Sequence, residues 1–309
     1  MDNKLLLPVA LFVSCAFVTC TFHNQKKTEN KPDTSPPSSL SITVPTTISV
    51  SDTKPSESLK TAETSSKAPD CNDCSLANSA PKVDRHLLIC GEFEDVDWPK
   101  KIEKEKDTFA CALAKALTEA AVTLSGADTP LFNVKMTACN EPNTLPNHHD
   151  IIVYPEKMRY SVPKDDLECL AAFATYISHP VLPTSTDFDT DTDLLPSEVI
   201  RSPRALPWET LLLVCTHGSR DKRCGRAGPI LIAALQAELA SRDLSISSKI
   251  AVRASSHIGG HRYAGTLIVY PQGQWYGFMT KKNAKPLLDS ILGGGILDKC
   301  FRGLGNISW

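Results

Sequence analysis

The sequence predicts an α/β protein in which one pattern of strands and helices occurs twice after a long N-terminal tract. Short apolar runs flank amphipathic helical stretches, and the same order of segments returns in the second half of the chain. The 309 residues are 41% hydrophobic and carry a formal charge of −2, which suits a globular protein of about two domains. The charge lacks the basic excess of a nucleic-acid binder, so no nucleic-acid partner is expected.

The N-terminal tract divides into two segments. Residues 1–22 are apolar over 5–22, which predicts a targeting or anchor segment and allows a membrane tether. Residues 23–80 are expected to form a disordered tether. Between residues 31 and 70 this tether is rich in Ser, Thr and Pro and has no aromatic residue, so it cannot bury enough apolar surface to offset the entropy of ordering.

The first copy of the pattern is expected over residues 81–180. Its strands are predicted from short apolar or aromatic runs, and its helices from apolar residues at helical spacing. In chain order the segments are a strand at 85–90, a helix at 111–117, strands at 134–139, 150–155 and 158–160, and a helix near 166–177.

The second copy, over residues 208–309, repeats this order. Its segments are a strand at 211–215, a helix at 230–239, strands at 250–254, 266–271 and 275–278, and a helix near 284–292. Residues 181–207 are acidic and bounded by prolines, so a solvated linker is expected between the copies.

Each copy joins a βαβ unit with a right-handed crossover to an antiparallel pair of strands. That arrangement is thioredoxin-like. The predicted architecture is therefore two tandem thioredoxin-like (β-α-β-β-α) halves preceded by the disordered tract.

Two loops of the second half carry side chains that bind metals. Cys215 and Cys224 lie on a loop after one predicted strand, and His257 and His261 lie on a loop after another. Because strand carboxyl ends converge at one edge of an α/β sheet, the four side chains can meet. Two thiolates and two imidazoles suit zinc, copper or an iron–sulfur cluster. The first half has only Cys90 in the place of Cys215, so the second copy alone is expected to keep the site.

The spacing departs from two familiar metal motifs. Zinc fingers place their cysteines two to four residues apart, whereas eight residues separate Cys215 from Cys224. A Rieske centre uses a Cys-x-His box and a Cys-x-x-His box; Cys215-Thr-His217 matches the first box and nothing matches the second. Scattered cysteines such as Cys90 and Cys139 are expected to be ordinary buried thiols.

Three motifs carry a resemblance to a known family: the segments Cys215–Gly225, Ser256–Gly265 and Trp275–Gly277. They closely resemble the sucrase/ferredoxin-like family, thioredoxin-like ferredoxins of fungi, plants and protists. The likeness covers roughly residue 70 to the C-terminus. It implies a 2Fe-2S cluster held by the two cysteines and two histidines Cys215, Cys224, His257 and His261. The sequence shows no carboxylate pair placed for glycoside hydrolysis, so sucrase activity is not expected.

The residues around this ligand set suit electron transfer. Neutral imidazoles in place of two anionic thiolates raise the potential of a cluster, and the positive charge of Arg220 acts in the same direction. We expect His217 and Asp221 to orient the ligands and their loop. Gly259 and Gly260 are expected to let the backbone approach the metal centre where a Cβ would clash.

An electron carrier in redox homeostasis is therefore expected rather than an enzyme, with donor and acceptor proteins that the sequence does not name. A zinc-stabilised binding module on the same four residues is one alternative. The other is a thiol–disulfide or peroxide enzyme of thioredoxin type that uses Cys215 or the pair Cys71 and Cys74, although that pair lies outside any strand–helix junction. Cluster assembly favours the cytoplasm or mitochondria, and the chain could form a homodimer.

Overall fold

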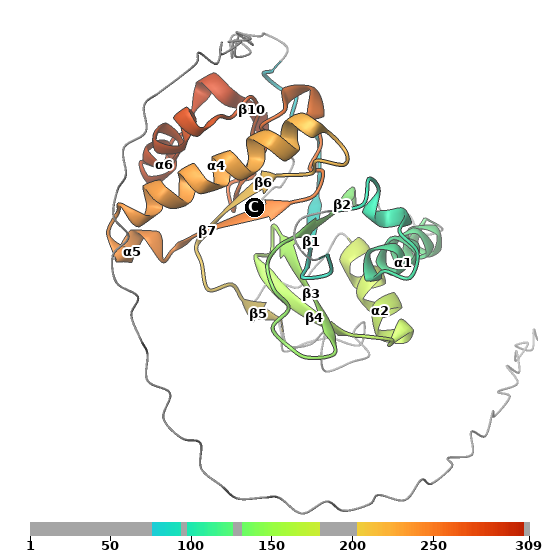
Figure 1. Cartoon of the computed structure of the whole chain (residues 1–309). Helices are drawn as coiled ribbons and strands as arrows, with labels where there is room; N and C mark the ends of the chain where they lie inside the picture. Colours follow the sequence, from blue (N-terminus) through green and yellow to red (C-terminus); the bar gives the residue numbers. More distant parts are fainter. Residues whose placement is uncertain (1–75, 94–97, 126–131, 180–202, 306–309) are drawn as a thin grey trace, which may run out of the picture. The chain divides into compact units, whose positions relative to one another are not determined.

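A computed structural model describes residues 76–93, 98–125, 132–179 and 203–305 (Figure 1). In these residues the strands join into one sheet with the order β10-β9-β8-β6-β7-β2-β1-β3-β4-β5. The order contains the same set of four strands twice, as β2-β1-β3-β4 and as β7-β6-β8-β9. The repeat expected from the sequence is therefore present in the sheet itself.

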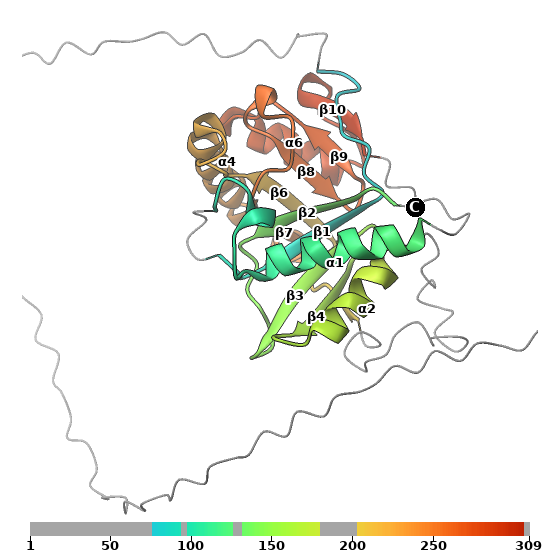
Figure 2. The same ribbon diagram turned by 90° about the vertical axis from the view of Figure 1, so that its right-hand side faces the viewer.

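The first half begins with a parallel pair and continues with antiparallel strands. Strand β1 pairs in parallel with β2 and antiparallel with β3, which pairs antiparallel with β4. Helices α1 and α2 pack together beside these strands (Figure 2). Its elements are β1 (Arg85–Cys90), a 3-10 turn (Ile102–Lys104), α1 (Phe109–Leu124), β2 (Val134–Cys139), β3 (His148–Tyr154), β4 (Met158–Pro163) and α2 (Leu167–Ser178).

The helices of this half begin at side-chain caps. The Thr108 hydroxyl accepts a hydrogen bond from the Cys111 N–H, and the Asp166 carboxylate accepts one from the Cys169 N–H. These caps satisfy N–H groups that have no partner inside a helix. The alanine-rich sequence of α1 also favours helix strongly, so α1 extends well beyond the predicted stretch.

The second half repeats this order between two additional short strands. Strand β5 adds to the edge of the first half, and β10 adds to β9. Its elements are β5 (Arg204–Ala205), β6 (Thr210–Cys215), α4 (Lys222–Ala240), α5 (Leu244–Ser247), β7 (Ile250–Ser255), β8 (Leu267–Tyr270), β9 (Gln274–Tyr276), α6 (Ala284–Leu292) and β10 (Phe301–Leu304), with 3-10 turns at His261–Tyr263, Lys281–Asn283 and Asp298–Cys300.

The strand order and directions confirm the expected α/β class with two thioredoxin-like halves. The aromatic run after each Tyr-Pro step forms the strand expected there, β4 or β9. Each half therefore follows a β-α-β-β-β-α order, with one strand more than the predicted β-α-β-β-α formula counts.

The two halves share part of their core. One apolar cluster lies under α1 and α2 and another under α4 and α6, but a third contains side chains of both halves. In this shared core Tyr154 stacks on Tyr270 with ring centroids 4.0 Å apart. The buried His86 ring lies 2.7 Å from the Tyr270 hydroxyl and 3.0 Å from the Thr137 hydroxyl. Polar as well as apolar contacts therefore join the halves.

Two further contacts connect the halves along the backbone. Strands β2 and β7 pair antiparallel at Cys139 and Ser255. The segment before β1 lies against the last strand, where the N–H groups of Ser79 and Ala80 donate to the Arg302 carbonyl. Strand β10 therefore contacts the segment just before β1.

Several expectations concern residues outside the described ranges. They are the apolar segment 5–22, most of the tether 23–80, the pair Cys71 and Cys74, and the acidic residues of the linker up to residue 202. Within the described ranges, no helix combines the length and apolarity needed to cross a membrane.

Candidate metal centre

The two cysteines of the predicted ligand set come together at the start of α4. Cys215 is the last residue of β6, and Cys224 lies in the first turn of α4. Both are buried, and their sulfurs are hydrogen-bonded to each other. A Cβ at Gly228 would lie 2.4 Å from the Cys215 carbonyl oxygen, so glycine at this position lets α4 pack directly on the end of β6.

The two histidines lie on the loop that follows β7. His257 is half-buried and His261 is exposed at the start of a short 3-10 turn. Their ring centroids are 5.6 Å apart, and the His257 side chain hydrogen-bonds to Cys215. The Arg223 guanidinium donates to the His261 carbonyl at 2.9 Å, which connects α4 to this loop. The structure therefore brings all four predicted residues to one place.

These side chains do not stand in a finished metal geometry. In the described parts of the chain, no group of three or more Cys, His, Asp or Glu side chains is arranged to hold a metal ion. The four donors nevertheless suit a soft or borderline metal by their chemistry, because two buried sulfurs face two accessible imidazoles.

The local electrostatics favour a thiolate at Cys215. The hydrogen bond from Cys224 holds the pKa of Cys215 well below its usual range, against the effect of burial. Hydrogen bonds from His257 and from the N–H groups of His217 and Ile258 act in the same direction. A thiolate is the form that binds metals, so these hydrogen bonds favour the form of Cys215 that a metal site would require.

The residues expected to orient the ligands make different contacts. His217 is buried, and its Nε2 lies 3.1 Å from the Pro99 carbonyl oxygen; its Nδ1 has no hydrogen-bond partner among the described residues. Asp221 caps α4 and pairs with Arg223 at 2.8 Å, which lowers the pKa of Asp221 to about 2. Asp221 therefore fixes the start of α4 and the Arg223 side chain that reaches the histidine loop. Arg220 is exposed.

The glycines of the histidine loop are explained by backbone conformation. Gly259 and Gly260 have φ values of +103° and +70°, which disfavour other residues. A Cβ on Gly260 would lie 2.4 Å from the Arg302 guanidinium, whereas a Cβ on Gly259 would meet nothing within 4 Å. At Gly260 the close approach of Arg302 therefore requires glycine, and the expected approach of this loop to a metal centre stays a prediction.

Arg302 is a residue of the site that sequence reasoning missed. This buried side chain on β10 donates to the Ser79 carbonyl at 2.7 Å and lies 3.5 Å from the Gly259 carbonyl oxygen. Burial lowers its pKa to about 10, so it remains charged at neutral pH. Only the fold brings β10 to the histidine loop, and no local motif marks Arg302.

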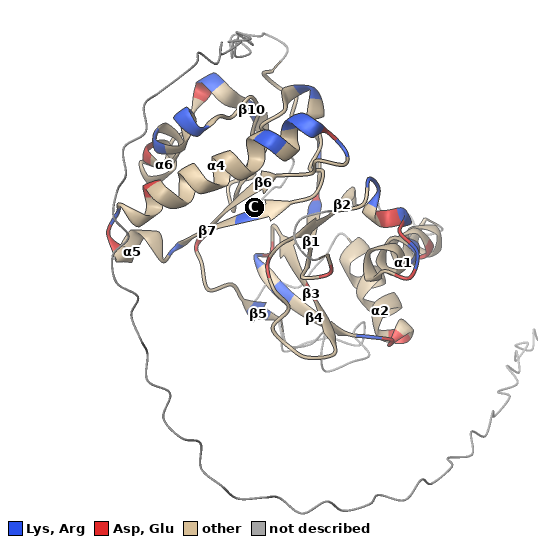
Figure 3. Ribbon diagram, in the orientation of Figure 1, with Lys and Arg blue, Asp and Glu red and all other residues tan. Residues whose placement is uncertain are grey.

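A cationic cavity of about 200 Å³ adjoins the site. Lys135, also missed in the sequence, contributes to it, and burial lowers the pKa of this amine to about 8. Further exposed cations lie at the start of α4 (Figure 3). We call five exposed side chains the cationic rim: Lys100 and Arg220, which line this cavity, Lys222 and Arg226 near the start of α4, and Arg262 in the histidine loop.

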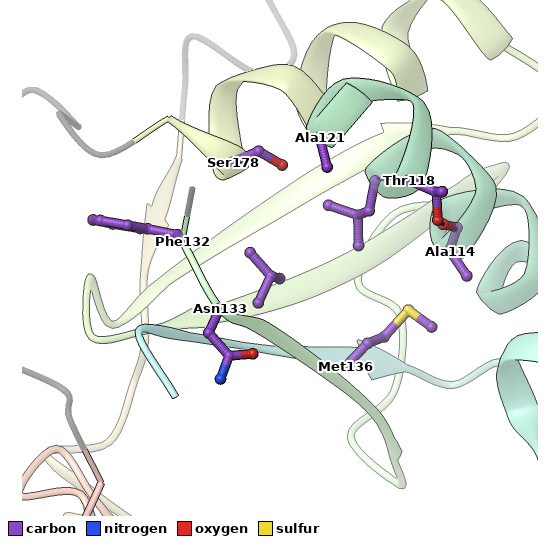
Figure 4. Close-up of a pocket in the computed structure, with 9 residues that line it drawn as sticks. Ala114, Thr118, Ala121, Phe132, Asn133, Met136 and Ser178 are labelled. Carbon is purple, nitrogen blue, oxygen red and sulfur yellow. The ribbon is translucent and has the colours of Figure 1, made fainter. Parts of the chain in front are cut away.

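A separate cavity of about 440 Å³ lies beside α1 and β2 (Figure 4). Phe132, Met136 and Ala121 are among the described side chains that line it, and none of the described lining side chains carries a titratable group.

Comparison with known proteins places these features in a family. A family model described as "Sucrase/ferredoxin-like" matches residues 76–303. Three relatives have the name "Altered inheritance of mitochondria protein 32". The protein from Debaryomyces hansenii is 37% identical over 99 residues, which are 30% of this chain and 35% of that protein. The protein from Meyerozyma guilliermondii is 25% identical over 76% of this chain and 85% of its own length. The protein from Saccharomyces cerevisiae is 28% identical over 74% and 79%.

Among solved structures, a thioredoxin-like 2Fe-2S ferredoxin from Aquifex aeolicus matches 30% of this chain and 90% of its own, with 15% identity and a TM-score of 0.28. The family model extends across nearly all the described residues of both halves. The chain belongs to the sucrase/ferredoxin-like family.

Proposed function

We propose that this chain is an electron-transfer protein whose second half holds a 2Fe-2S cluster through Cys215, Cys224, His257 and His261. The main support is the meeting of two buried sulfurs, one poised as a thiolate, with two imidazoles at the ends of β6 and β7. Membership of a ferredoxin-like family agrees with a redox-related role. When bound, such a cluster supplies one-electron transfer.

The candidate site has one buried side and one side that solvent reaches. The cysteines are buried beneath α4, whereas His261 is exposed and His257 half-buried. Imidazole ligands, unlike thiolates, can take up a proton when a cluster is reduced. We therefore expect a reduction potential that falls as pH rises, because reduction is then accompanied by proton uptake. A potential that stays constant between about pH 6 and 9 would contradict histidine ligation.

The cationic rim suggests the kind of redox partner. The chain as a whole has a formal charge of −2, yet lysines and arginines lie at the start of α4 (Figure 3), and Lys100 and Arg220 line the cavity that His257 also borders. A positive surface steers an acidic protein toward the site, and salt weakens this steering. An acidic donor or acceptor is therefore expected. Reversing the charge at Arg226, whose guanidinium donates to the Lys222 carbonyl at 3.4 Å, should slow electron exchange with such a partner at low ionic strength but not at high.

The decisive experiment is anaerobic purification, followed by absorption spectroscopy and electron paramagnetic resonance after dithionite. A red-brown protein with stoichiometric iron and sulfide, whose visible absorbance bleaches on reduction, is the expected result. Colourless protein with stoichiometric zinc would overturn the proposal in favour of the zinc-stabilised module. Colourless protein without metal would favour the thiol enzyme, whose candidate pair Cys71 and Cys74 lies outside the described residues.

The cellular location is part of the proposal. Relatives bear a name that refers to the inheritance of mitochondria, and we propose a mitochondrial location for this chain, with the cytoplasm as the alternative. Fractionation of cells that express the full chain with a C-terminal tag tests this. Deleting residues 1–22 in the same experiment shows whether that apolar segment directs the location.

A further inference from the structure

A second pair of thiols lies at the ends of the first-half strands. Cys90 ends β1, Cys139 ends β2, and the two residues are register partners in the parallel pair. Their Sγ atoms are 3.9 Å apart, and the side chains are only 0% and 2% exposed. We propose that Cys90 and Cys139 form a second redox site, a dithiol that hydrogen peroxide converts to a disulfide.

The strand geometry suits this bond. Neighbouring strands lie about 4.8 Å apart, which is within the Cα separation of roughly 4.4–6.8 Å that a disulfide spans. From 3.9 Å, the sulfurs must approach by about 2 Å to reach the bonding distance. Rotation of the two side chains can supply this movement, because the strands already hold the Cα atoms in register. The backbone pairing of β1 with β2 can stay intact.

The burial of the pair limits access to small oxidants. Burial and the hydrogen bond to Cys139 also raise the pKa of Cys90 well above its usual range, so its thiolate forms rarely and oxidation is expected to be slow. The positive charge of Arg159 acts in the opposite direction. Ion pairs to Glu141 at 2.6 Å and Asp150 at 3.0 Å hold that guanidinium in place. Hydrogen peroxide is small and uncharged, and so suits a buried pair next to a fixed cation.

The reaction balances with peroxide as the oxidant. One sulfur, as its thiolate, attacks an oxygen of hydrogen peroxide; the O–O bond breaks, and a sulfenic acid and hydroxide form. The second sulfur then attacks the first, the S–O bond breaks, and the oxygen leaves as water. Two electrons pass from the two sulfurs to one peroxide molecule, and the products are one disulfide and two waters. A dithiol reductant reverses the change.

The position of the pair connects the two halves chemically. Register partners form a continuous row across four strands: Cys90 on β1, Cys139 on β2, Ser255 on β7 and Cys215 on β6. The dithiol thus lies in line with the candidate metal ligand Cys215, with Ser255 between them. On this proposal the first half, which lacks the histidine pair, has a redox site of its own. Cys90 and Cys139 are buried thiols, as the sequence predicted, and the strand register places them side by side.

Peptide mapping of the full-length protein, purified with its metal, tests the proposal. The protein is exposed to hydrogen peroxide, denatured, alkylated, digested and analysed by mass spectrometry. We expect a peptide pair linked through Cys90 and Cys139, with loss of the alkylated forms of both, and dithiothreitol should restore them. Cys90→Ser and Cys139→Ser should each abolish the link. Cys111→Ser, a matched change on the partly exposed helix α1, should leave it unchanged.

Two outcomes would overturn the proposal. Either Cys90 and Cys139 remain fully alkylatable at peroxide doses that oxidise Cys111, or they appear as separate sulfinic acids or in links to other cysteines. The peptide map of the wild-type protein tests the proposal even if the buried serine of Cys90→Ser or Cys139→Ser prevents the variant from folding. The link does not depend on the metal centre, so iron-free protein that forms it would contradict the proposed function alone.

Discussion

Arg302 connects the last strand to the histidine loop, and its replacement by methionine tests whether the loop depends on that contact. The guanidinium donates to the Ser79 carbonyl at 2.7 Å and to the Ser79 hydroxyl at 3.1 Å, and lies 3.5 Å from the Gly259 carbonyl oxygen. It also lies over the Tyr263 ring, 4.9 Å from the centroid. Arg302→Met keeps an apolar stem against Tyr263 and removes every donor.

Two opposing free energies determine the effect on overall stability. The two shorter hydrogen bonds, each with a charged donor, contribute about 1.5–3 kcal/mol apiece. Burial of the charge opposes them: the pKa of Arg302 falls from 12.5 to about 10, which corresponds to about 3 kcal/mol. The side chain is only 2% exposed, so little solvent screening reduces this value. The free energy of unfolding of Arg302→Met should therefore fall by only about 0–3 kcal/mol.

The histidine loop should respond more strongly than the fold. We expect hydrogen exchange across residues 256–263 to accelerate about tenfold or more, which corresponds to about 1.4 kcal/mol of local stability, while exchange in β6 and α4 changes less. Urea unfolding gives the global value. Arg302→Lys is the control, because its ammonium group can still reach the Ser79 carbonyl. Its hydrogen-exchange rate across residues 256–263 should lie between the rates of wild type and Arg302→Met. Equal acceleration throughout the protein, or none in the loop, would refute the positioning role.

Three other predictions concern separate features. His261→Ala should release iron from the purified protein, whereas His217→Ala should retain it, as measured by iron content and visible absorbance; the reverse would show that the ligand is His217. Burial holds the pKa of His86 well below 6.5, so below pH 6.5 the unfolded chain gains a proton that the folded chain does not bind. The free energy of unfolding should then fall by about 1.4 kcal/mol for each pH unit within this range. In His86→Gln, the pH dependence of the unfolding free energy, measured by urea unfolding at several pH values, should be smaller by that amount. Asp150→Ala removes a buried carboxylate that accepts from Thr144 and Arg159, and should lower the unfolding free energy by about 3 kcal/mol; a loss below about 1 kcal/mol would contradict this account.

The sequence predicted the local elements well, because they are encoded in short stretches, and it predicted that the two cysteines and two histidines would lie near one another. The apolar run before Cys215 gave a strand with the expected end, whereas the role of the four residues as cluster ligands rests on the family resemblance and stays a prediction. The contacts around the site were not predictable in this way. Arg302 reaches Ser79 across more than two hundred residues of chain, and no periodicity encodes such a contact.

The thiol pair of the first half shows the same limit. Cys90 and Cys139 looked unrelated in the sequence, and only the register of β1 with β2 brings their sulfurs together. Pairing depends on which residues oppose each other across parallel strands, and a crossover helix sets this register at a distance.

The core shared by the halves has a consequence for the use of this fold. Tyr154 and His86 of the first half pack on and bond to Tyr270 of the second, so each half covers apolar surface that the other would expose to water. The two halves of the chain resemble the subunits of a dimer that are joined covalently. The covalent link keeps each half at a high effective concentration relative to the other. The second half should therefore not fold stably on its own: a fragment from residue 203 onward would expose Tyr270 to water and aggregate.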